Sequence, residues 1–135
     1  MEKEYTVLIV DDEPEALDMV RLMLKNSPFR PIVAHSGEEA LQIARSNPID
    51  VVLLDIMMPD MSGVTVCGYL RTAPQLRTIP IVMLTALDDY STRRKAIQAG
   101  ATDLVTKPVS REELLAKLNG VMSEYEITAN PNWAR

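Results

Sequence analysis

Short, mostly apolar runs divide this chain, and each of them is followed by a polar residue. The four clearest runs are 7–10, 51–54, 81–84 and 104–106. Runs of about four β-branched or aliphatic residues are typical of strands buried on both faces of a parallel sheet. In the segments between them, apolar residues recur every three or four positions, which is the pattern of amphipathic helices.

This alternation predicts five strands and five helices. The strands are expected at 6–10, 31–34, 51–54, 79–84 and 102–106, and the helices at 14–25, 37–45, 63–72, 90–99 and 110–125. A loop over 55–62 joins the third strand to the third helix. Five strand–helix units with short connections predict one α/β domain. We expect a doubly wound, flavodoxin-like parallel sheet of strand order 2-1-3-4-5.

Composition supports a single compact domain. The chain has 135 residues, 47% of them hydrophobic, and no apolar stretch approaches the roughly 20 residues of a membrane helix. Its start is polar, without the apolar segment of a secretory signal, and the single Cys67 excludes an internal disulfide. We therefore expect a cytoplasmic domain over 1–126. Residues 127–135 are expected to form a tail or the start of a linker.

The charge balance argues against nucleic acid as a direct partner. The formal net charge is −5, and residues 93–95 form the only basic run. A nucleic-acid surface requires more positive charge with aromatic residues interleaved, so we interpret this run as a solvated helix face. No membrane association is expected either.

Three carboxylates follow two of the predicted strands. Asp11 and Asp12 follow the first strand and Asp55 follows the third. The order 2-1-3-4-5 places these strands side by side, so the carboxylates meet at one edge of the sheet. An all-oxygen cluster of this kind suits Mg²⁺. The alternative for Asp12 is a helix N-cap with Glu15 three positions later, but it leaves Asp11 without a role.

A phosphoryl group offers a second use for the same edge. The carboxylate of Asp55 can act as a nucleophile and form an acyl phosphate. Thr85 and Lys107 follow the fourth and fifth predicted strands, where a hydroxyl can donate a hydrogen bond and an ammonium can balance phosphoryl charge. The alternatives are an ordinary strand-end hydroxyl and a surface lysine.

With these residues in place, the chain resembles the receiver domain of bacterial two-component response regulators. The matching segments are VDDEP (10–14), LDIMMPDMSG (54–63), LTA (84–86), AGATD (99–103) and TKP (106–108). The resemblance implies that Asp55 is the phosphoacceptor for a histidine kinase or a histidine phosphotransfer protein. It also implies that Asp11, Asp12, Asp55 and the backbone carbonyl of Met57 bind Mg²⁺.

The same resemblance implies a switch rather than an enzyme. Thr85 is similar in position to the switch hydroxyl and Lys107 to the phosphate-contacting lysine, with a cis peptide bond between Lys107 and Pro108. Phosphorylation would change the face formed by the fourth helix, the fifth strand and the fifth helix. That face would regulate a partner, an output domain beyond residue 135, or a phosphorylation-dependent homodimer.

Leu104 and Val109 depart from the family pattern; Val109 follows the Lys-Pro pair, where the family often has Phe. Leu104 stands at the switch-aromatic position, three residues before the lysine, where the family commonly has Tyr or Phe. Aromatic switching of the usual kind is therefore not expected; Tyr90 is one substitute, and an ordinary surface tyrosine is the alternative. Met57 provides no acid or amide to position a hydrolytic water, which predicts a long-lived phosphoryl group.

Two other classes of protein remain as alternatives. A phosphatase of the haloacid dehalogenase type requires an acid two residues after its nucleophile, where this chain has Met57. A receiver-like module that is never phosphorylated would not require the intact set of site residues. A further question concerns Met19, Leu22 and Met23, which lie outside the core stripe of helix 14–25: they serve either partner docking or core packing.

Overall fold

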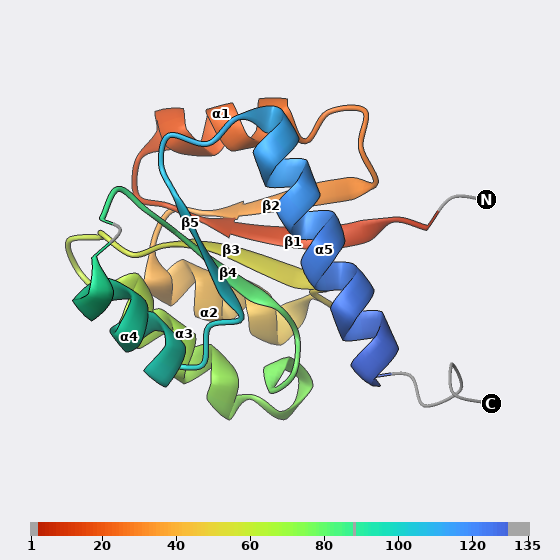
Figure 1. The fold of residues 1–135 in the computed structure, drawn as a ribbon. Helices are drawn as coiled ribbons and strands as arrows, with labels where there is room; N and C mark the ends of the chain where they lie inside the picture. The colour runs from red at the N-terminus through yellow and green to blue at the C-terminus, as the bar shows by residue number, and fades with distance from the viewer. Residues whose placement is uncertain (1–2, 88, 130–135) are drawn as a thin grey trace.

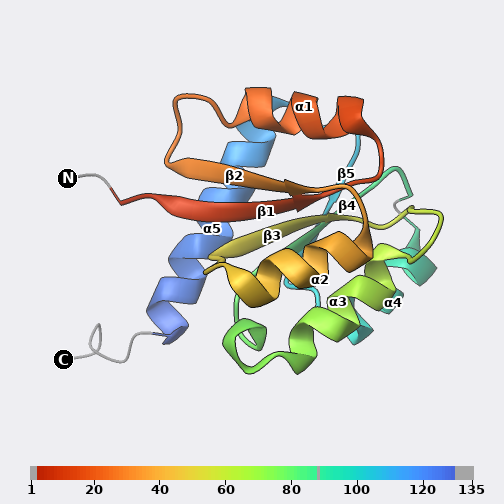
Figure 2. The same ribbon diagram turned by 180° about the vertical axis from the view of Figure 1, so that it is seen from behind.

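The computed structural model describes residues 3–87 and 89–129. The chain folds into three layers, a parallel five-stranded sheet between two layers of helices (Figures 1 and 2). The elements are β1 (Tyr5–Val10), α1 (Pro14–Met23), β2 (Phe29–Ala34), α2 (Gly37–Ser46), β3 (Val51–Asp55), α3 (Gly63–Thr72), the 3₁₀ turn η1 (Pro74–Leu76), β4 (Ile81–Thr85), α4 (Tyr90–Gln98), β5 (Asp103–Thr106) and α5 (Arg111–Ala129). The strand order is β2-β1-β3-β4-β5, which confirms the predicted fold class and sheet order.

Burial along the strands follows their place in the sheet. Every residue of β3 and β4 is buried, as expected for inner strands covered on both faces. The edge strand β2 is only partly buried and contains Pro31, which pairs in register with Val7 of β1. An edge strand tolerates proline because its missing N–H would face away from the sheet.

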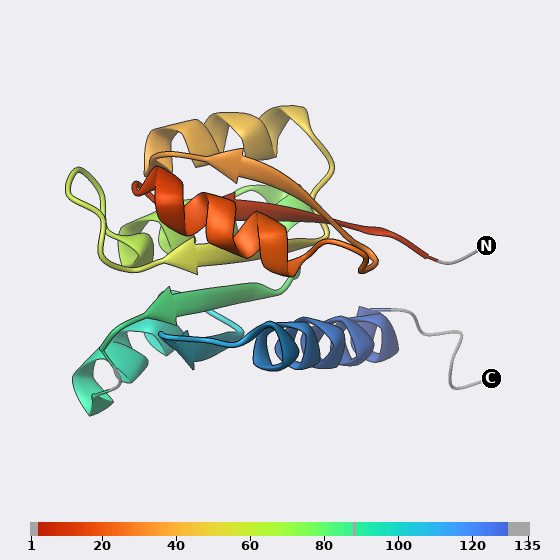
Figure 3. The same cartoon turned by 90° about the horizontal axis from the view of Figure 1, so that it is seen from above.

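Two apolar cores lie on the two faces of the sheet. Helices α1 and α5 cover one face, with Leu17 and Leu118 among the side chains that reach it. Helices α2, α3 and α4 cover the other, with Val66 of α3 fully buried there. Seen from above, α1 lies near β1 and β2 while α5 lies along the β4 and β5 side (Figure 3).

Serine side chains begin several helices. Ser36 accepts a hydrogen bond from the N–H of Glu39 at 3.1 Å, and Ser62 accepts one from Thr65 at 3.3 Å. At the start of α5, Ser110 Oγ accepts from the Glu113 N–H while the Glu113 carboxylate accepts from the Ser110 N–H. This reciprocal pair of hydrogen bonds is a capping box.

Several predicted boundaries were wrong by one to four residues. Helix α1 ends at Met23 instead of residue 25, because the chain turns through Asn26 in the left-handed region at φ 59°. Strand β2 begins at Phe29 instead of residue 31, since Tyr5 pairs with Phe29 at the start of β1. Strand β4 begins at Ile81 instead of residue 79.

The end of the chain also differs from expectation. Helix α5 continues to Ala129, beyond the predicted end at residue 125, so the first part of the expected tail is helical. The remainder of that tail, with Trp133, lies outside the described residues. The domain boundary at residue 126 stays a prediction.

Two expectations away from the strand ends are confirmed. Cys67 is fully buried in α3, and burial raises the pKa of its thiol, which fits a packing residue. The basic run of α4, Arg93 to Lys95, is exposed to solvent. In the described part of the chain, every helix is too short or too polar to cross a lipid bilayer.

Candidate functional site

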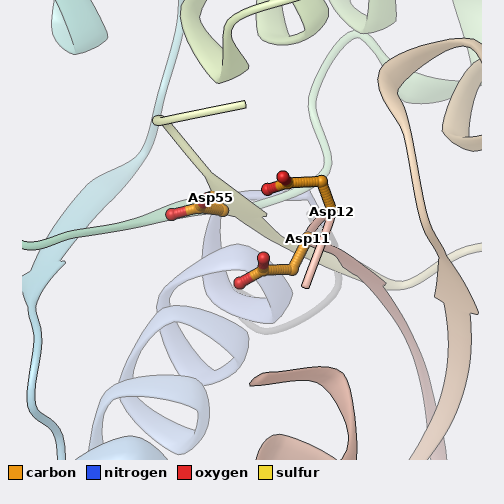
Figure 4. A group of neighbouring side chains, drawn as sticks. All are labelled: Asp11, Asp12 and Asp55. Atoms are coloured by element: carbon orange, nitrogen blue, oxygen red, sulfur yellow. The ribbon is translucent and has the colours of Figure 1, made fainter. Parts of the chain in front are cut away.

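The three carboxylates predicted to meet do meet at the carboxyl ends of β1 and β3. Figure 4 shows Asp11, Asp12 and Asp55 directed toward a common space. One carboxylate oxygen from each residue lies within 4.8 Å of those of the other two. The register explains this convergence, since Val10 pairs with Leu54 and the residues that follow them stand side by side.

The two neighbouring aspartates have different surroundings. Asp11 is buried, and its Oδ1 accepts a hydrogen bond from the Glu13 N–H at 3.0 Å. Asp12 is half-buried and does not cap α1, because the N-cap residue is Glu13 and the helix begins at Pro14. The capping alternative for Asp12 is therefore wrong. Asp12 therefore has no capping role that would compete with metal binding.

Lys107 stands between two of these carboxylates. Its Nζ lies 3.2 Å from Asp55 Oδ1 and 3.3 Å from Asp11 Oδ2. The backbone fixes its place, because the Lys107 N–H donates to the Thr85 carbonyl at 2.7 Å. The peptide bond between Lys107 and Pro108 is cis, as expected. The structure thus joins the ends of β1, β3 and β5 through one ammonium group.

The charges of the site are not balanced. Burial, together with the charge of Asp11, raises the pKa of Asp55 to about 6, although Lys107 acts in the opposite direction. Burial alone would lower the pKa of Lys107, but the charges and hydrogen bonds of Asp55 and Asp11 outweigh it, so that pKa is raised. Three carboxylates lie near one ammonium group, so negatively charged groups outnumber positively charged ones in the cluster.

This donor set fits a divalent cation. Carboxylate oxygens are the ligands that Mg²⁺ prefers, and Mg²⁺ requires only one or two of them because it retains several waters. Burial and, after it, the charge of Asp11 raise the pKa of Asp55, and a bound cation would act in the opposite direction. The Met57 side chain is exposed, and the role of its backbone carbonyl as a ligand stays a prediction.

Thr85 completes the row of strand ends. It is the last residue of β4, is fully buried, and pairs with Thr106 directly before Lys107. Its Oγ accepts a hydrogen bond from the Leu87 N–H at 3.0 Å. The hydroxyl proton remains for donation to another acceptor. A shift of this side chain would therefore act directly on the loop that leads into α4.

Gly63 supports Asp55 from behind, a role that sequence reasoning did not assign. A Cβ on this first residue of α3 would lie 2.2 Å from the Asp55 carbonyl oxygen. The Gly63 N–H donates to the Ile56 carbonyl at 2.9 Å. Only glycine allows α3 to begin this close to the end of β3. The sequence signal was a glycine placed directly after a serine N-cap.

The predicted switch-aromatic position is occupied by a buried aliphatic residue. Leu104 is 9% exposed and belongs to the same core as Ala96 of α4. Tyr90 begins α4 and is 79% exposed, which agrees with the surface-tyrosine alternative. In this conformation, aliphatic packing between β5 and α4 takes the place that an aromatic ring would occupy.

Comparison with known proteins decides the family. The sequence profile of the response regulator receiver domain matches residues 7–119. The chain belongs to the response regulator receiver family. Receiver domains act in two-component signal transduction, and phosphorylation and Mg²⁺ binding are typical of them.

Individual relatives agree with this assignment. The transcriptional regulatory protein KdpE of Mycobacterium tuberculosis is 42% identical over 116 residues, which are 86% of this chain and 50% of KdpE. The chemotaxis protein CheY4 of Vibrio cholerae superposes with a TM-score of 0.85 at 32% identity, covering 87% of this chain and 98% of CheY4. The receiver chain spans about half the length of the curated relatives that it matches.

A further neighbour bears on the acidic cluster. The receiver domain of the sensor histidine kinase PA1611 from Pseudomonas aeruginosa has a TM-score of 0.82 at 28% identity, covering 89% of this chain and 98% of that one. That structure holds a magnesium ion coordinated in its active-site cleft. The curated relatives and the matched family profile are those of response regulators rather than classical enzymes.

Proposed function

We propose that this receiver is a phosphorylation-dependent switch in which Asp55 accepts a phosphoryl group from a histidine kinase or a histidine phosphotransfer protein. The observation that carries the proposal is the contact of Lys107 Nζ with Asp55 Oδ1 at 3.2 Å, beside the carboxylates of Asp11 and Asp12. A nucleophilic carboxylate, a cation-binding cluster and a phosphate-pairing ammonium are the parts that phosphoryl transfer requires.

The reaction makes and breaks one bond. An oxygen of Asp55 attacks phosphorus, a bond forms between that oxygen and phosphorus, and the bond from phosphorus to the donor imidazole breaks with its electron pair leaving on nitrogen. The nucleophile must be ionised, and a pKa of about 6 leaves Asp55 mostly ionised at neutral pH. Asp11, Asp12 and Asp55, with the Met57 carbonyl, would hold Mg²⁺. When bound, Mg²⁺ supplies positive charge to the phosphoryl oxygens.

After transfer, the surrounding groups respond to the new charge. The phosphoryl group adds about 1.5 to 2 negative charges and three strong acceptor oxygens. Lys107 pairs with one oxygen, and the Thr85 hydroxyl donates to another. Movement of Thr85 pulls on its hydrogen bond with the Leu87 N–H, so the loop into α4 rearranges. The face made by α4, β5 and α5 changes as a result.

The changed face would control a partner or an output domain beyond residue 135 in the cytoplasm, or a phosphorylation-dependent homodimer. Several relatives are named as transcriptional regulators, and the chain spans only about half of them. We propose that any contact with nucleic acid belongs to such an additional domain. The acidic receiver itself, with a net charge of −5, is not the DNA-binding part.

Labelling with a small phosphodonor tests the proposed function. The protein is incubated with acetyl phosphate and Mg²⁺, and both covalent phosphate and released inorganic phosphate are measured. We expect stable labelling of up to one phosphoryl group per chain, lost on chelation of Mg²⁺ and in Asp55→Asn. Steady phosphate release without accumulation would indicate a phosphatase instead. Neither labelling nor release would indicate a module that works without phosphorylation.

A further inference from the structure

An apolar groove opens directly beside the acidic site. It lies between α1 and the connection from β5 to α5, and its volume is about 580 Å³. Asp11 and Lys107, which both flank Asp55, line one part of it. The remaining lining is apolar and includes Ala16, Met19, Leu84 and Val109. The groove is therefore continuous with the site and polar only where the two meet.

The apolar residues of α1 that lie outside its core stripe differ in what they face. Met19 is 54% exposed and lines the groove, whereas Leu17 and Val20 are the buried residues of α1. Leu22 is 58% exposed on the same helix and does not line the groove. Met19 and Leu22 are thus two apolar side chains of similar exposure, of which only one faces the groove. Unbranched methionine adapts its shape to what it contacts.

We propose that this groove binds the hydrocarbon part of small acyl phosphates, so that Asp55 accepts phosphoryl groups faster from donors with short hydrocarbon chains than from acetyl phosphate. The inference rests on the proposed function. An occupant that reaches the site from the groove needs an anionic end near Lys107 and an apolar body beyond it. An acyl phosphate has this distribution of charge.

The chemistry needs no further reactant. An oxygen of Asp55 forms a bond to phosphorus, the bond between phosphorus and the acyl oxygen breaks, and the electron pair leaves with the carboxylate product. The hydrocarbon chain stays in the groove through the transition state, so its burial accelerates transfer. Burial of one methylene group is worth about fourfold, so two methylenes give about tenfold when solvent still reaches part of the chain.

The test compares two donors that react by the same chemistry. The rate of labelling of the Mg²⁺-loaded full chain is measured with acetyl phosphate and with butyryl phosphate, each well below saturation. We expect a rate constant about tenfold higher for butyryl phosphate. Met19→Ala, which removes groove contacts, lowers the butyryl-to-acetyl ratio. Leu22→Ala is the matched control from the same helix and leaves the ratio unchanged.

A second variant fills the groove instead of widening it. Ala16→Phe is expected to bring the butyryl-to-acetyl ratio of labelling rates to about one. A ratio near one in the parent protein would overturn the groove proposal and leave the proposed function standing. Labelling by neither donor would overturn both. An effect of Met19→Ala on transfer from a phosphohistidine protein, with an unchanged donor ratio, would assign the groove to that protein and overturn the acyl proposal.

Discussion

Two partly buried cations stand at opposite edges of the sheet and have different kinds of partners. At the carboxyl edge, Lys107 lies between the carboxylates of Asp55 and Asp11. At the amino edge, Arg71 donates to neutral carbonyl oxygens. Within residues 3–87 and 89–129, no carboxylate lies within ion-pair distance of Arg71. A positive side chain therefore forms ion pairs at the carboxyl edge and hydrogen bonds to neutral groups at the amino edge.

The Arg71 edge is a structural joint. Its guanidinium donates to the carbonyls of Gly100 at 2.9 Å, Leu76 at 2.9 Å and Ile79 at 2.6 Å. Gly100 has a φ of 104°, and a Cβ there would lie 2.9 Å from Arg71 Cγ. One side chain of α3 thus holds the turn before β4 and the turn after α4. Burial lowers the pKa of Arg71. Its partners are neutral carbonyl groups, so no ion pair is present here that a charged ligand could replace.

The Lys107 edge has the opposite character. The partners of Lys107 are carboxylates that outnumber the ammonium, and burial together with the charge of Asp11 raises the pKa of Asp55. Such a cluster gains by admitting a cation and by exchanging one ion pair for another. We therefore propose that signalling uses the Lys107 edge, while the Arg71 edge, where one cation satisfies several neutral groups, contributes to stability.

The strongest separation of the two edges comes from Arg71→Met. Loss of the guanidinium leaves carbonyls without donors, so we expect the free energy of unfolding to fall by about 3 to 4 kcal/mol in urea titrations. Labelling of the folded fraction by acetyl phosphate remains unchanged. Arg77→Met, at an exposed position on the same edge, is the control and changes stability by less than about 0.5 kcal/mol. Equal losses in both variants would refute the joint.

The Asp55 edge is predicted to make stability depend on pH. Its pKa rises from 3.8 to about 6 on folding, so between these values the folded protein binds more protons than the unfolded one. Without Mg²⁺, the free energy of unfolding therefore falls by about 2 to 3 kcal/mol as pH increases from about 4 to 6. Asp55→Asn removes this slope, and Mg²⁺ stabilises the parent mainly above pH 6. Parallel pH profiles for the parent and Asp55→Asn would contradict the assignment.

Removal of Lys107 tests how strongly its charge affects the pKa of Asp55. Lys107→Met takes away the charge that lowers the pKa of Asp55, so that pKa is expected to rise above about 6 in a carbon-detected NMR titration. Lys117→Met is the matched control. Lys117 has a similar exposure, 35% against 34%, but pairs with Asp103 instead. A similar displacement in both variants would show that the effect is not local to the site.

The smallest expected effect is that of Met57 substitutions on the lifetime of the phosphorylated protein. Its side chain is 61% exposed two residues after Asp55 and offers no group that binds water. Met57→Asn introduces an amide, which is expected to shorten the lifetime of the phosphorylated protein several-fold. The lifetime is measured by loss of label after the donor is removed, and Met57→Ala is expected to leave it unchanged. A shorter lifetime in Met57→Ala but not in Met57→Asn would contradict this view.

The carboxyl edge was predictable from sequence, whereas the amino edge was not. Asp55 and Thr85 end recognisable strands and Lys107 directly follows one, and parallel topology brings such residues together whatever the details of packing. Arg71 lies within a helix, and its carbonyl partners leave no side-chain signature in the sequence. The groove was likewise hidden, because it forms only when α1 meets the connection from β5 to α5.

Boundaries failed where tertiary pairing outweighed local preference. Pro31 suggested a strand start, yet β2 begins at Phe29 because the edge strand pairs with Tyr5. Asp12 has the residue type of an N-cap, but α1 begins one residue too late for it. The acidic pair could therefore be located from sequence. The different burial and hydrogen bonding of Asp11 and Asp12 could be seen only in the structure.

The most direct test of the central claim locates the phosphoryl group itself. The protein is labelled with acetyl phosphate and Mg²⁺ and then treated with borohydride, which reduces an aspartyl phosphate to homoserine; peptide mass spectrometry identifies the converted residue. The account predicts homoserine at position 55 alone, and none when Mg²⁺ is chelated. Conversion at Asp11, Asp12 or any other residue, or none after full incubation, would contradict it.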